Sequence, residues 1–570
     1  MLMRTTISQA VVTVALSTIA RAANVIHVNP TATGANDGSS WADAFTDLQD
    51  ALVAAAPGME IWAAAGVYTP GPPEDAVSSF VLKSGVALYG GFAGAEETRD
   101  QRDWRMNATV LSGDVGRDDV YGAGVWYLGW NRNTANSGHV VVGSGVDSTA
   151  ALDGFVITAG ATGPNGTPAN SEFMYGGGLY NINGSPTVRN CTFTRNLAAF
   201  GPGAAIYNYD SSPTITNCTF KENYVHLGHG AGVFNGGSSS PAISDCTFAD
   251  NLCNGGQPEA AGAGISNYFT PPITVERCTF ERNVVANGFG GVYPAYGGAI
   301  ENLGTALTVR NCVFRGNVAN SGGAINTFAA TTVINSLFVD NRAASYDIGG
   351  GLGVDGIGGA ITNLGFGEVQ TLLINCTIVA NRANEGGGVF TANGHRAVLR
   401  NTIVWANVAT GEEVSPRDAQ YKGATDVLYS CVQDLLTPVP GEDPPNPADY
   451  PGSTGADPLF VDLATRDCHL RSTSPSVDSG DPTFAPPPML DLDGLDRVRC
   501  GRVDMGAYEF GVGDLTCDRI LGSADFTLFG GCMAGPDGAI ASTCEDADFD
   551  ASGHVDLCDF GVLQRAVADW

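Results

Sequence analysis

A stretch near the C-terminus carries oxygen-bearing groups at the spacing of a calcium-binding loop. Across residues 548–559, side chains fill positions 1, 3, 5, 9 and 12, and position 7 offers its carbonyl. In loop order these residues are Asp548, Asp550, Ser552, His554, Asp556 and Asp559. Gly553 at position 6 permits the tight turn. Because calcium prefers hard oxygen ligands, the spacing predicts a calcium site, with an acidic exposed turn as the alternative.

An upstream copy of this loop keeps fewer ligands. The residues at its positions 1, 3, 5 and 12 are Asp514, Thr516, Asp518 and Asp525. Arg519 stands where the turn glycine belongs, and Gly522 supplies no ligand at position 9. We therefore expect the upstream loop to bind calcium less readily than the downstream loop.

Another group of titratable residues lies in the first third of the chain. Asp114, Asp118 and Asp119 are close in sequence, and His139 follows them. Neighbouring carboxylates are what a polysaccharide hydrolase needs, and an adjacent base serves acid–base chemistry. The favoured interpretation is an exposed acidic loop, but an active site at these residues stays open.

An internal repeat must position these residues. From Gly176 onward, a glycine-pair element such as GGGLYN (residues 176–181) alternates eight times with an element such as NCTFTRN (residues 190–196). Equivalent cysteines are 27, 28, 32 and 34 residues apart, at Cys191, Cys218, Cys246, Cys278 and Cys312. The length varies only before the next glycine pair. Each unit is therefore predicted to be one coil of a solenoid with one loop of free length.

The repeated elements alternate like strands and are too short for helices. Cys191 and Phe193 share one face, whereas Thr192 points away. Asn190 suits a corner, because asparagine tolerates left-handed backbone angles. Coils stacked about 4.8 Å apart would form ladders of buried Cys and Phe. A corner ladder of hydrogen-bonded amides is expected at Asn196, Asn223, Asn251, Asn283, Asn317, Asn341, Asn381 and Asn407.

The ladder cysteines are interpreted as small buried residues rather than as disulfides. Ser336 and Thr402 take the cysteine position in two units without breaking the pattern. No CxxC spacing points to a zinc site. In the C-terminal module, by contrast, cysteines could form stapling disulfides whose pairing the sequence leaves open. These residues are Cys517, Cys532, Cys544 and Cys558.

One outward column of the solenoid is a candidate binding face. If Leu179 points inward, the outward column reads Tyr180, Tyr207, Phe234, Ser266, Glu301, Asn326, Thr362 and Phe390. With one carboxylate and no lysine or arginine, the column is poor for acid–base catalysis. Rings on consecutive coils could stack against sugars or an apolar partner, with Tyr293 and Tyr296 in adjoining loops. Alternatively, overlying loops cover the rings.

The paired elements GG[AG][ILV]xN and FxxN resemble the repeats of chlamydial polymorphic outer-membrane proteins, over residues 176–407. This resemblance implies an all-β fold, a right-handed, single-stranded parallel β-helix of the pectate-lyase type. Residues 456–510 resemble a closing module of exported bacterial proteins and include two closing strands, ADPLFVD and VDMGAYEF. The downstream calcium loop with a helix over residues 560–568 resembles half of a dockerin, which implies a cohesin-like partner.

The composition limits which partners the protein can bind and where in or outside the cell it acts. The net charge is −31, with only 15% of residues charged, which excludes nucleic acid and anionic lipid surfaces as partners. Arg4, an apolar run and the Ala20-Arg21-Ala22 site read as a signal peptide. No later stretch is long and apolar enough to span a bilayer. We therefore expect a secreted or cell-surface protein.

The predicted organisation has five parts. Residues 1–22 are the signal peptide, 23–175 a cap and early coils, 176–432 the regular coils, 433–510 a loop with the closing module, and 511–570 the dockerin-like module. Residues 41–55 are predicted to form an amphipathic cap helix. The favoured function is non-catalytic binding of carbohydrate or a protein, with a calcium cofactor. The alternative is a polysaccharide lyase or glycoside hydrolase.

Overall fold

A computed structural model provides the structure of this chain. It describes most residues of the chain, and the predicted signal peptide lies outside the described residues. The excepted residues are 1–23, 120–135, 164–173, 256–259, 288–294, 348–352, 355, 366–368, 393, 413, 439–442, 484–489, 499–500, 512, 534, 536–543, 545–546, 550–551, 553 and 570.

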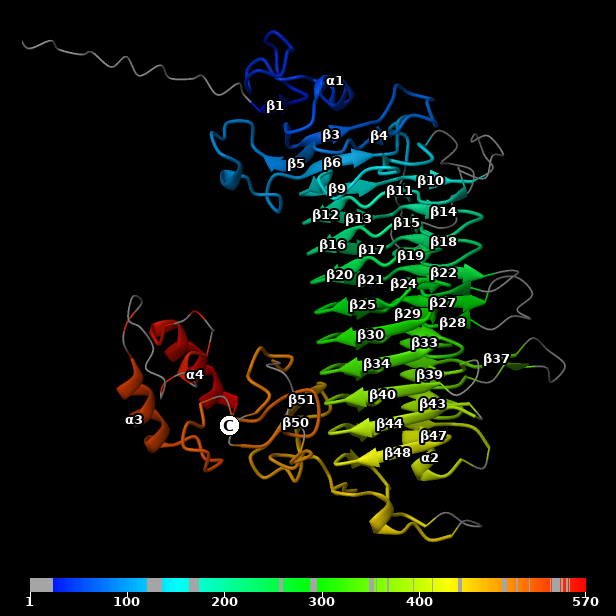
Figure 1. The fold of residues 1–570 in the computed structure, drawn as a ribbon, viewed down its shortest axis with the longest axis vertical. Coiled ribbons are helices and arrows are strands. Elements are labelled where there is room, and N and C mark those ends of the chain that lie inside the picture. Colours follow the sequence, from blue (N-terminus) through cyan, green and yellow to red (C-terminus); the bar gives the residue numbers. More distant parts are fainter. Residues whose placement is uncertain are drawn as a thin grey trace, which may run out of the picture.

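The described strands stack into a long solenoid with four ladders running along its length (Figure 1). All strand pairs within these four ladders are parallel, and successive coils place equivalent residues side by side, as in Phe193↔Phe220 and Phe220↔Phe248. This confirms the predicted parallel β-helix. We name the ladders sheets A to D in the order in which one coil visits them.

Sheets A and B are the longer ladders. Sheet A contains β1 (Val25–Val28), β2 (Glu60–Ala64), β5 (Ala87–Phe92), β8 (Ala151–Asp153), β12 (Thr187–Arg189), β16 (Thr214–Thr216), β20 (Ala242–Ser244), β25 (Ile273–Glu276), β30 (Ala306–Arg310), β34 (Ala330–Ile334), β40 (Gln370–Ile374), β44 (Arg396–Arg400) and β48 (Thr425–Leu428). Sheet B contains β3 (Gly66–Tyr68), β6 (Thr109–Ser112), β9 (Phe155–Thr158), β13 (Thr192–Thr194), β17 (Thr219–Lys221), β21 (Thr247–Ala249), β26 (Thr279–Glu281), β31 (Val313–Arg315), β35 (Leu337–Val339), β41 (Thr377–Val379), β45 (Ile403–Trp405) and β49 (Cys431–Val432).

Sheets C and D complete each coil. Sheet C contains β10 (Ala161–Thr162), β14 (Leu197–Ala198), β18 (Tyr224–Val225), β22 (Leu252–Gly255), β27 (Val284–Asn287), β32 (Val318–Ala319), β36 (Arg342–Ala343), β42 (Arg382–Ala383) and β46 (Val408–Ala409). Sheet D contains β4 (Phe80–Val81), β7 (Val141–Val142), β11 (Leu179–Ile182), β15 (Ile206–Tyr209), β19 (Val233–Gly236), β24 (Ile265–Tyr268), β29 (Ile300–Leu303), β33 (Ile325–Thr327), β39 (Ile361–Asn363), β43 (Val389–Thr391) and β47 (Tyr421–Lys422).

Smaller elements lie at the loops and ends. Two-stranded pairs are formed by β23 (Ala260–Ala261) with β28 (Ala295–Tyr296), β37 (Tyr346–Asp347) with β38 (Gly353–Val354), and β50 (Phe460–Asp462) with β51 (Asp467–Leu470). The helices are α1 (Leu48–Ala54), α2 (Pro416–Gln420), α3 (Ser523–Cys532) and α4 (Leu557–Asp569), with short 3₁₀ turns at Arg99–Gln101 and Pro447–Asp449.

The corners of each coil use left-handed residues. In one coil, Asn190 (φ 54°) turns the chain from sheet A to sheet B, and Arg195 (φ 56°) turns it from sheet B to sheet C. The predicted corner at Asn190 is therefore confirmed. The loop of variable length follows sheet C, and the glycine pair then leads the chain into sheet D.

The interior is built from the predicted ladders. Rings of Phe193, Phe220 and Phe248 stack with centroid distances of 5.2 and 4.6 Å, and the stack continues through Phe280, Phe314 and Phe338. The ladder cysteines are buried and form no disulfides. Ser336 lies in the cysteine ladder, since its Oγ accepts a hydrogen bond from the Cys312 amide. This confirms the interpretation of these cysteines as packing residues.

The corner asparagines form the predicted amide ladder. Nδ2 of Asn251 donates to Oδ1 of Asn283 at 2.9 Å and to the carbonyl of Phe220 at 2.9 Å. The same pattern recurs from Asn196 through Asn381, and Asn407 continues it to Gln420. These amides are almost fully buried, so the ladder satisfies groups that water cannot reach.

The N-terminal cap differs in detail from the prediction. The helix covers only Leu48–Ala54 instead of residues 41–55, because the side chain of Asp47 accepts from the Gln49 amide and begins the helix there. The early coils predicted within residues 23–175 contain strands β1 to β10.

The closing segment folds back along the side of the solenoid beside its last coils (Figure 1). Its strands β50 and β51 pair with each other in antiparallel fashion, and residues 503–510 form no strand, so that prediction was wrong. The segment instead covers the outer face of sheet B with apolar side chains, including Phe460 and Met505 packed near Leu337 and Ile403. The closing segment packs on this face because the outward residues of sheet B are apolar there.

The C-terminal module is a small helical unit attached beside this segment (Figure 1). A compact core of Phe529, Val555 and Leu563 joins α3 and α4. Within the part of the chain that the structure describes, no helix has the length and hydrophobicity needed to cross a membrane.

Candidate functional site

The predicted outward column exists and extends further than the sequence indicated. Strand register pairs Tyr180 with Tyr207, Tyr207 with Phe234, and so on along sheet D to Phe390. One more coil adds Lys422, which forms an ion pair with Glu385 at 3.3 Å.

Tyr180, Tyr207 and Phe234, three aromatic residues on consecutive coils of the column, are stacked but covered. Centroids of Tyr180 and Tyr207 are 5.7 Å apart, and those of Tyr207 and Phe234 are 5.4 Å apart. Tyr175 stacks on Tyr207, and His139 stacks on Tyr180. Tyr180, Tyr207 and Phe234 are only 8%, 7% and 6% exposed. Burial raises the pKa of the Tyr207 hydroxyl. Of the two interpretations, covering by neighbouring segments is the one observed.

Exposed aromatic residues lie two or three residues further along the chain from the column positions. Tyr209 is 42% exposed, Tyr268 39% and Phe269 66%. We call these three residues the aromatic ridge. Tyr209 and Tyr268 both pair in register with Gly236, so they are two coils, or about 10 Å, apart.

Covered rings support the ridge from beneath. Tyr209 lies parallel to Tyr207 with a centroid distance of 6.4 Å, and Tyr268 lies 6.4 Å from Phe234. Phe269 contacts Tyr268 edge to face at 4.7 Å. The buried stack therefore holds the exposed rings on a rigid base.

Phe269 occupies a corner that other coils give to residues suited to it. In four consecutive coils the residue after the sheet D strand is left-handed, and Asn183, Asp210 and Gly237 take this position in the three coils before Phe269. Phe269 takes φ 54° at the same place, which is costly for a bulky side chain. Nothing in the packing of the coil demands a phenyl ring there, since most of the ring faces solvent.

The only carboxylate of the outward column is enclosed. Oε2 of Glu301 accepts a 2.6 Å hydrogen bond from Ser266 and lies 3.9 Å from Nδ1 of His229. Burial lowers the pKa of His229 to about 4, so the imidazole is neutral near pH 7. Because Glu301 is only 2% exposed, this group does not present acid–base chemistry to a polymer.

The structure describes one of the two predicted loop tyrosines. Tyr296 lies in β28 and contacts Phe328 edge to face at 5.5 Å. Tyr293 lies outside the described residues.

The upstream loop of the C-terminal module gathers its acidic residues. Ligand oxygens of Asp514, Asp518 and Asp525 lie within 4.8 Å of one another. Burial opposes ionisation of Asp525, but the amides of Gly522 and Thr516 hold its pKa below the ordinary value. Arg519 makes the left-handed turn (φ 62°) in place of glycine. All donors are oxygens, so the set fits calcium.

The downstream loop repeats this geometry 34 residues later. Asp559 accepts the amide of Asp556, as Asp525 accepts that of Gly522. Each also accepts an amide from the start of its loop, Phe549 for Asp559 and Thr516 for Asp525, although these two donors are not at equivalent loop positions. Oδ1 of Asp548 accepts from Ser552, as Asp514 accepts from Asp518. Of the predicted ligands, His554 is described and Asp550 lies outside the described residues.

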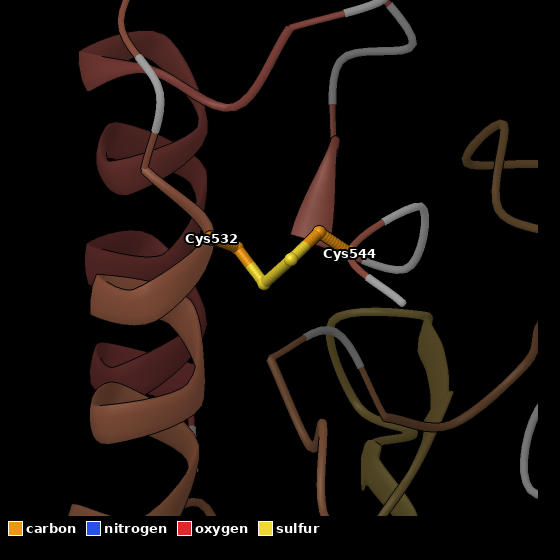
Figure 2. Close-up of a disulfide and its surroundings, with 2 residues drawn as sticks. All are labelled: Cys532 and Cys544. Carbon is orange, nitrogen blue, oxygen red and sulfur yellow. A yellow bond between two sulfur atoms is a disulfide. The ribbon is translucent and has the colours of Figure 1, made fainter. Parts of the chain in front are cut away.

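Cross-links and an ion pair hold the module. Cys532 and Cys544 form a disulfide (Figure 2), and Cys517 is also disulfide-bonded. The guanidinium of Arg519 donates to Asp478 at 2.8 Å and to the carbonyl of Val477, both in the closing segment. The residue that weakens the loop as a calcium motif thus attaches the module to the solenoid.

The candidate residues in the first third of the chain lie in two different surroundings, one for the three aspartates and one for His139. Asp114, Asp118 and Asp119 form a group with ligand oxygens within 4.8 Å of one another. His139 is buried, and its Nδ1 lies 3.1 Å from the carbonyl of Gly176 while its ring stacks on Tyr180. The imidazole is therefore committed to the aromatic stack.

The aromatic ridge was not predicted from the sequence. The predicted binding column consists of the first outward residue of each sheet D strand, whereas Tyr209 and Tyr268 are second outward residues. A signal was available in Tyr268-Phe269-Thr270-Pro271-Pro272, because two aromatics at a corner before a proline pair are unusual.

Comparisons with known proteins address the fold. A family model described as a right-handed beta helix region matches residues 122–279 and 167–356. Two solved structures are similar: pectate lyase Pel9A (14% identity, 85% of this chain and 96% of that chain, TM-score 0.40), and the catalytic unit of a thermostable GH87 alpha-1,3-glucanase from Streptomyces thermodiastaticus strain HF3-3 (13% identity, 72% and 66%, TM-score 0.31). No curated protein matches the chain. The family match and the parallel register together identify the fold as a right-handed parallel β-helix.

Proposed function

We propose that this protein is an exported β-helix that binds a neutral polysaccharide along its aromatic ridge without cleaving it. The observation that carries the proposal is Phe269, a ring held 66% exposed in a left-handed conformation that neighbouring coils give to Asn, Asp or Gly. A residue that costs stability at its position and faces solvent is best explained by a ligand.

The chemistry of the ridge favours sugars. Flat rings stack against the apolar faces of pyranoses, and the exposed Asp210 carboxylate with the nearby Ser212 hydroxyl offers polar partners beside them. Two ridge rings about 10 Å apart suit an extended chain better than a single sugar. The net charge of −31 repels anionic polymers, so we commit to neutral polysaccharides.

The non-catalytic part of the proposal rests on what surrounds the ridge. Among the described residues of the outward column, the single carboxylate Glu301 is enclosed by Ser266 and His229. Glycoside hydrolysis requires a pair of carboxylates that reach the substrate. A polysaccharide lyase or hydrolase remains the second candidate, because Asp114, Asp118 and Asp119 are close together.

The C-terminal module adds a second proposed role. Two loops with the same hydrogen-bond pattern and oxygen-only donors support calcium binding and docking onto a cohesin-like protein. Docking would place the β-helix at the surface that carries the cohesin-like protein. Recovery of such a partner with calcium but not with chelator is the expected result, and equal recovery in both would count against it.

Binding is tested by affinity electrophoresis of the full chain in gels containing glucan, xylan, mannan or polygalacturonate. We expect retardation by at least one neutral polymer and none by polygalacturonate. Tyr268→Ala should weaken binding about tenfold, because loss of one stacked ring removes about 1.4 kcal/mol. The control is Phe526→Ala, which removes an exposed ring of the C-terminal module.

The same polymers test for cleavage. After incubation with calcium, new reducing ends or the absorbance of unsaturated uronates would defeat the non-catalytic proposal and support the enzyme. Retardation by no neutral polymer would defeat the binding proposal. Export is tested separately by cell fractionation and by the N-terminal sequence of the mature chain, which should begin after Ala22.

A further inference from the structure

Two glycines interrupt the aromatic ridge on its middle coil. Strand register places Gly236 between Tyr209 and Tyr268, and Gly237 follows it at the corner. A Cβ atom on Gly237 would lie 3.3 Å from Cε1 of Tyr209 and 2.4 Å from Oδ1 of Asp210. The ring and the carboxylate of the preceding coil therefore meet over this bare backbone, and a side chain there would displace the carboxylate.

Asp210 is held in place but keeps capacity for a ligand. Its Oδ1 accepts a hydrogen bond from the Ser238 amide at 2.8 Å. Within the part of the chain that the structure describes, its Oδ2 accepts no hydrogen bond, and the residue is exposed. Because an ionised carboxylate has about four acceptor sites, further donors can bind to Asp210.

The other left-handed corner carboxylates of the regular coils are neutralised by arginine. The ion pairs are Arg195–Glu222, Arg277–Asp245, Arg282–Asp250 and Arg466–Asp340. Asp210 has the same left-handed backbone (φ 51°) but no arginine partner among the described residues. A carboxylate that forms no ion pair and lies against an exposed ring is available to a ligand.

We propose that Tyr209 and Asp210 form one sugar subsite for a pyranose that has two neighbouring free hydroxyls. The ring stacks on the apolar face of the sugar, and the carboxylate accepts hydrogen bonds from two hydroxyls on its edge. Because a carboxylate only accepts, the subsite selects sugars with hydroxyl donors and rejects uronates and sulfated sugars by charge repulsion. This inference rests on the proposed binding of a neutral polysaccharide and names what the ridge recognises in it.

The subsite is tested with the full chain and the neutral polymer that retards it in affinity electrophoresis. Asp210→Asn should weaken binding about tenfold or more, since hydrogen bonds to a charged group are stronger than those to an amide. The fold accommodates this change, because Asn183 holds the equivalent corner of the preceding coil. The control is Asp245→Asn, at a left-handed corner whose carboxylate pairs with arginine, and it should leave binding unchanged.

A double-variant cycle tests whether the ring and the carboxylate contact the same sugar. Tyr209→Ala should weaken binding about tenfold. Adding Asp210→Asn should then weaken it by less than the product of the two single losses, because the sugar has already left the carboxylate. Circular dichroism of each variant checks that the β-helix is intact.

The outcomes separate this inference from the proposed function. Unchanged binding by Asp210→Asn, or single losses that multiply in the double variant, would overturn the subsite. The proposed function would survive either result if Tyr268→Ala still weakened binding. Retardation of the unaltered protein by no neutral polymer would overturn both.

Discussion

Two corner residues differ in whether the fold explains them: Asn190 suits its corner, whereas Phe269 does not. Many corners have left-handed backbone, and most of these carry Asn, Asp or Gly, which adopt it at low cost. The corner at Asn190 was predictable for this reason. The corner at Phe269 was not, because phenylalanine gives no local signal for left-handed backbone, and only stacking of the coils places it there.

Replacement of Phe269 by the residue type of a neighbouring corner should stabilise the protein. Phe269→Asn is expected to raise the free energy of unfolding by about 1 kcal/mol, since asparagine relieves the left-handed strain. Thermal and urea unfolding measure the change. The reciprocal variant Asn183→Phe, at the equivalent exposed corner, should lose a similar amount, and a destabilised Phe269→Asn protein would contradict the assignment of strain.

The ladder cysteines should be inert in the native protein. Burial raises the pKa of Cys218 and of Cys312 well above the ordinary value, so little thiolate forms. We expect iodoacetamide to label them only after denaturation, as mapped by mass spectrometry. Cys246→Ser should cost less than about 1.5 kcal/mol, because Ser336 already occupies the ladder; rapid labelling of native Cys246 would show that the ladder is not closed.

Among the elements, the amide ladder at the corner after sheet B is the most exacting. Asn251 donates to Phe220 and Asn283, and its Oδ1 accepts from Asn223. Asn251→Ala leaves several buried groups unpaired and should cost about 3 kcal/mol or more. Chemical denaturation measures the loss, and Asn217→Gly, at an exposed left-handed corner, is the control with a loss below about 1 kcal/mol. Equal losses of stability in the two variants would show that the buried amide ladder does not contribute more than an ordinary corner.

The sequence predicted these ladders because their residues recur in register. It did not predict where the closing segment packs, although a signal exists. The outward column of sheet B reads threonine at Thr192, Thr219, Thr247 and Thr279 and then turns apolar at Val313 and Leu337. Apolar outward residues imply a covering layer, but only tertiary contact between distant segments identifies which part of the chain supplies it.

The closing segment should lose stability in mild alkali. Burial alone would lower the pKa of His469, but Asp493 and Asp467 on its two ring nitrogens raise it to about 9. The raised pKa means that this stabilisation is complete below about pH 6.5 and disappears as the pH rises through 9.

Hydrogen exchange of residues 460–508 between pH 6 and pH 10 measures this effect, after correction for the intrinsic pH dependence of exchange. His469→Gln should remove the decline, with a change in melting temperature on the order of a few degrees. His27→Gln should not, because burial lowers the pKa of His27 and keeps it neutral throughout this range. A decline that persists in His469→Gln would assign it to other groups.

At the scale of the whole molecule, the chain combines a rigid solenoid with a module that a few contacts attach. The solenoid was predictable from the two elements that recur in every unit, because each coil buries its ladder against the next. The attachment of the module through Arg519 and Asp478 was not, since it joins segments with no repeat between them. Of the candidate sites, the two proposed calcium loops were suggested by ligand spacing in the sequence, whereas the ridge required three-dimensional register.

Removal of calcium should act on the module and spare the solenoid. With calcium at about 100 times its dissociation constant, binding stabilises the module by about 2.7 kcal/mol per site. Chelator should therefore speed hydrogen exchange in residues 514–569 while residues 187–400 keep their protection. Asp559→Asn should reproduce part of this effect without chelator, and unchanged exchange on chelation would argue against calcium in the C-terminal loops.

The measurement that most directly tests the account is the dissociation constant of the Phe269→Asn variant for the neutral polysaccharide that retards the unaltered protein. We expect binding at least tenfold weaker in a protein whose melting temperature is equal or higher. An unchanged dissociation constant would contradict it, because the exposed ring would then carry a conformational cost with no ligand to explain it.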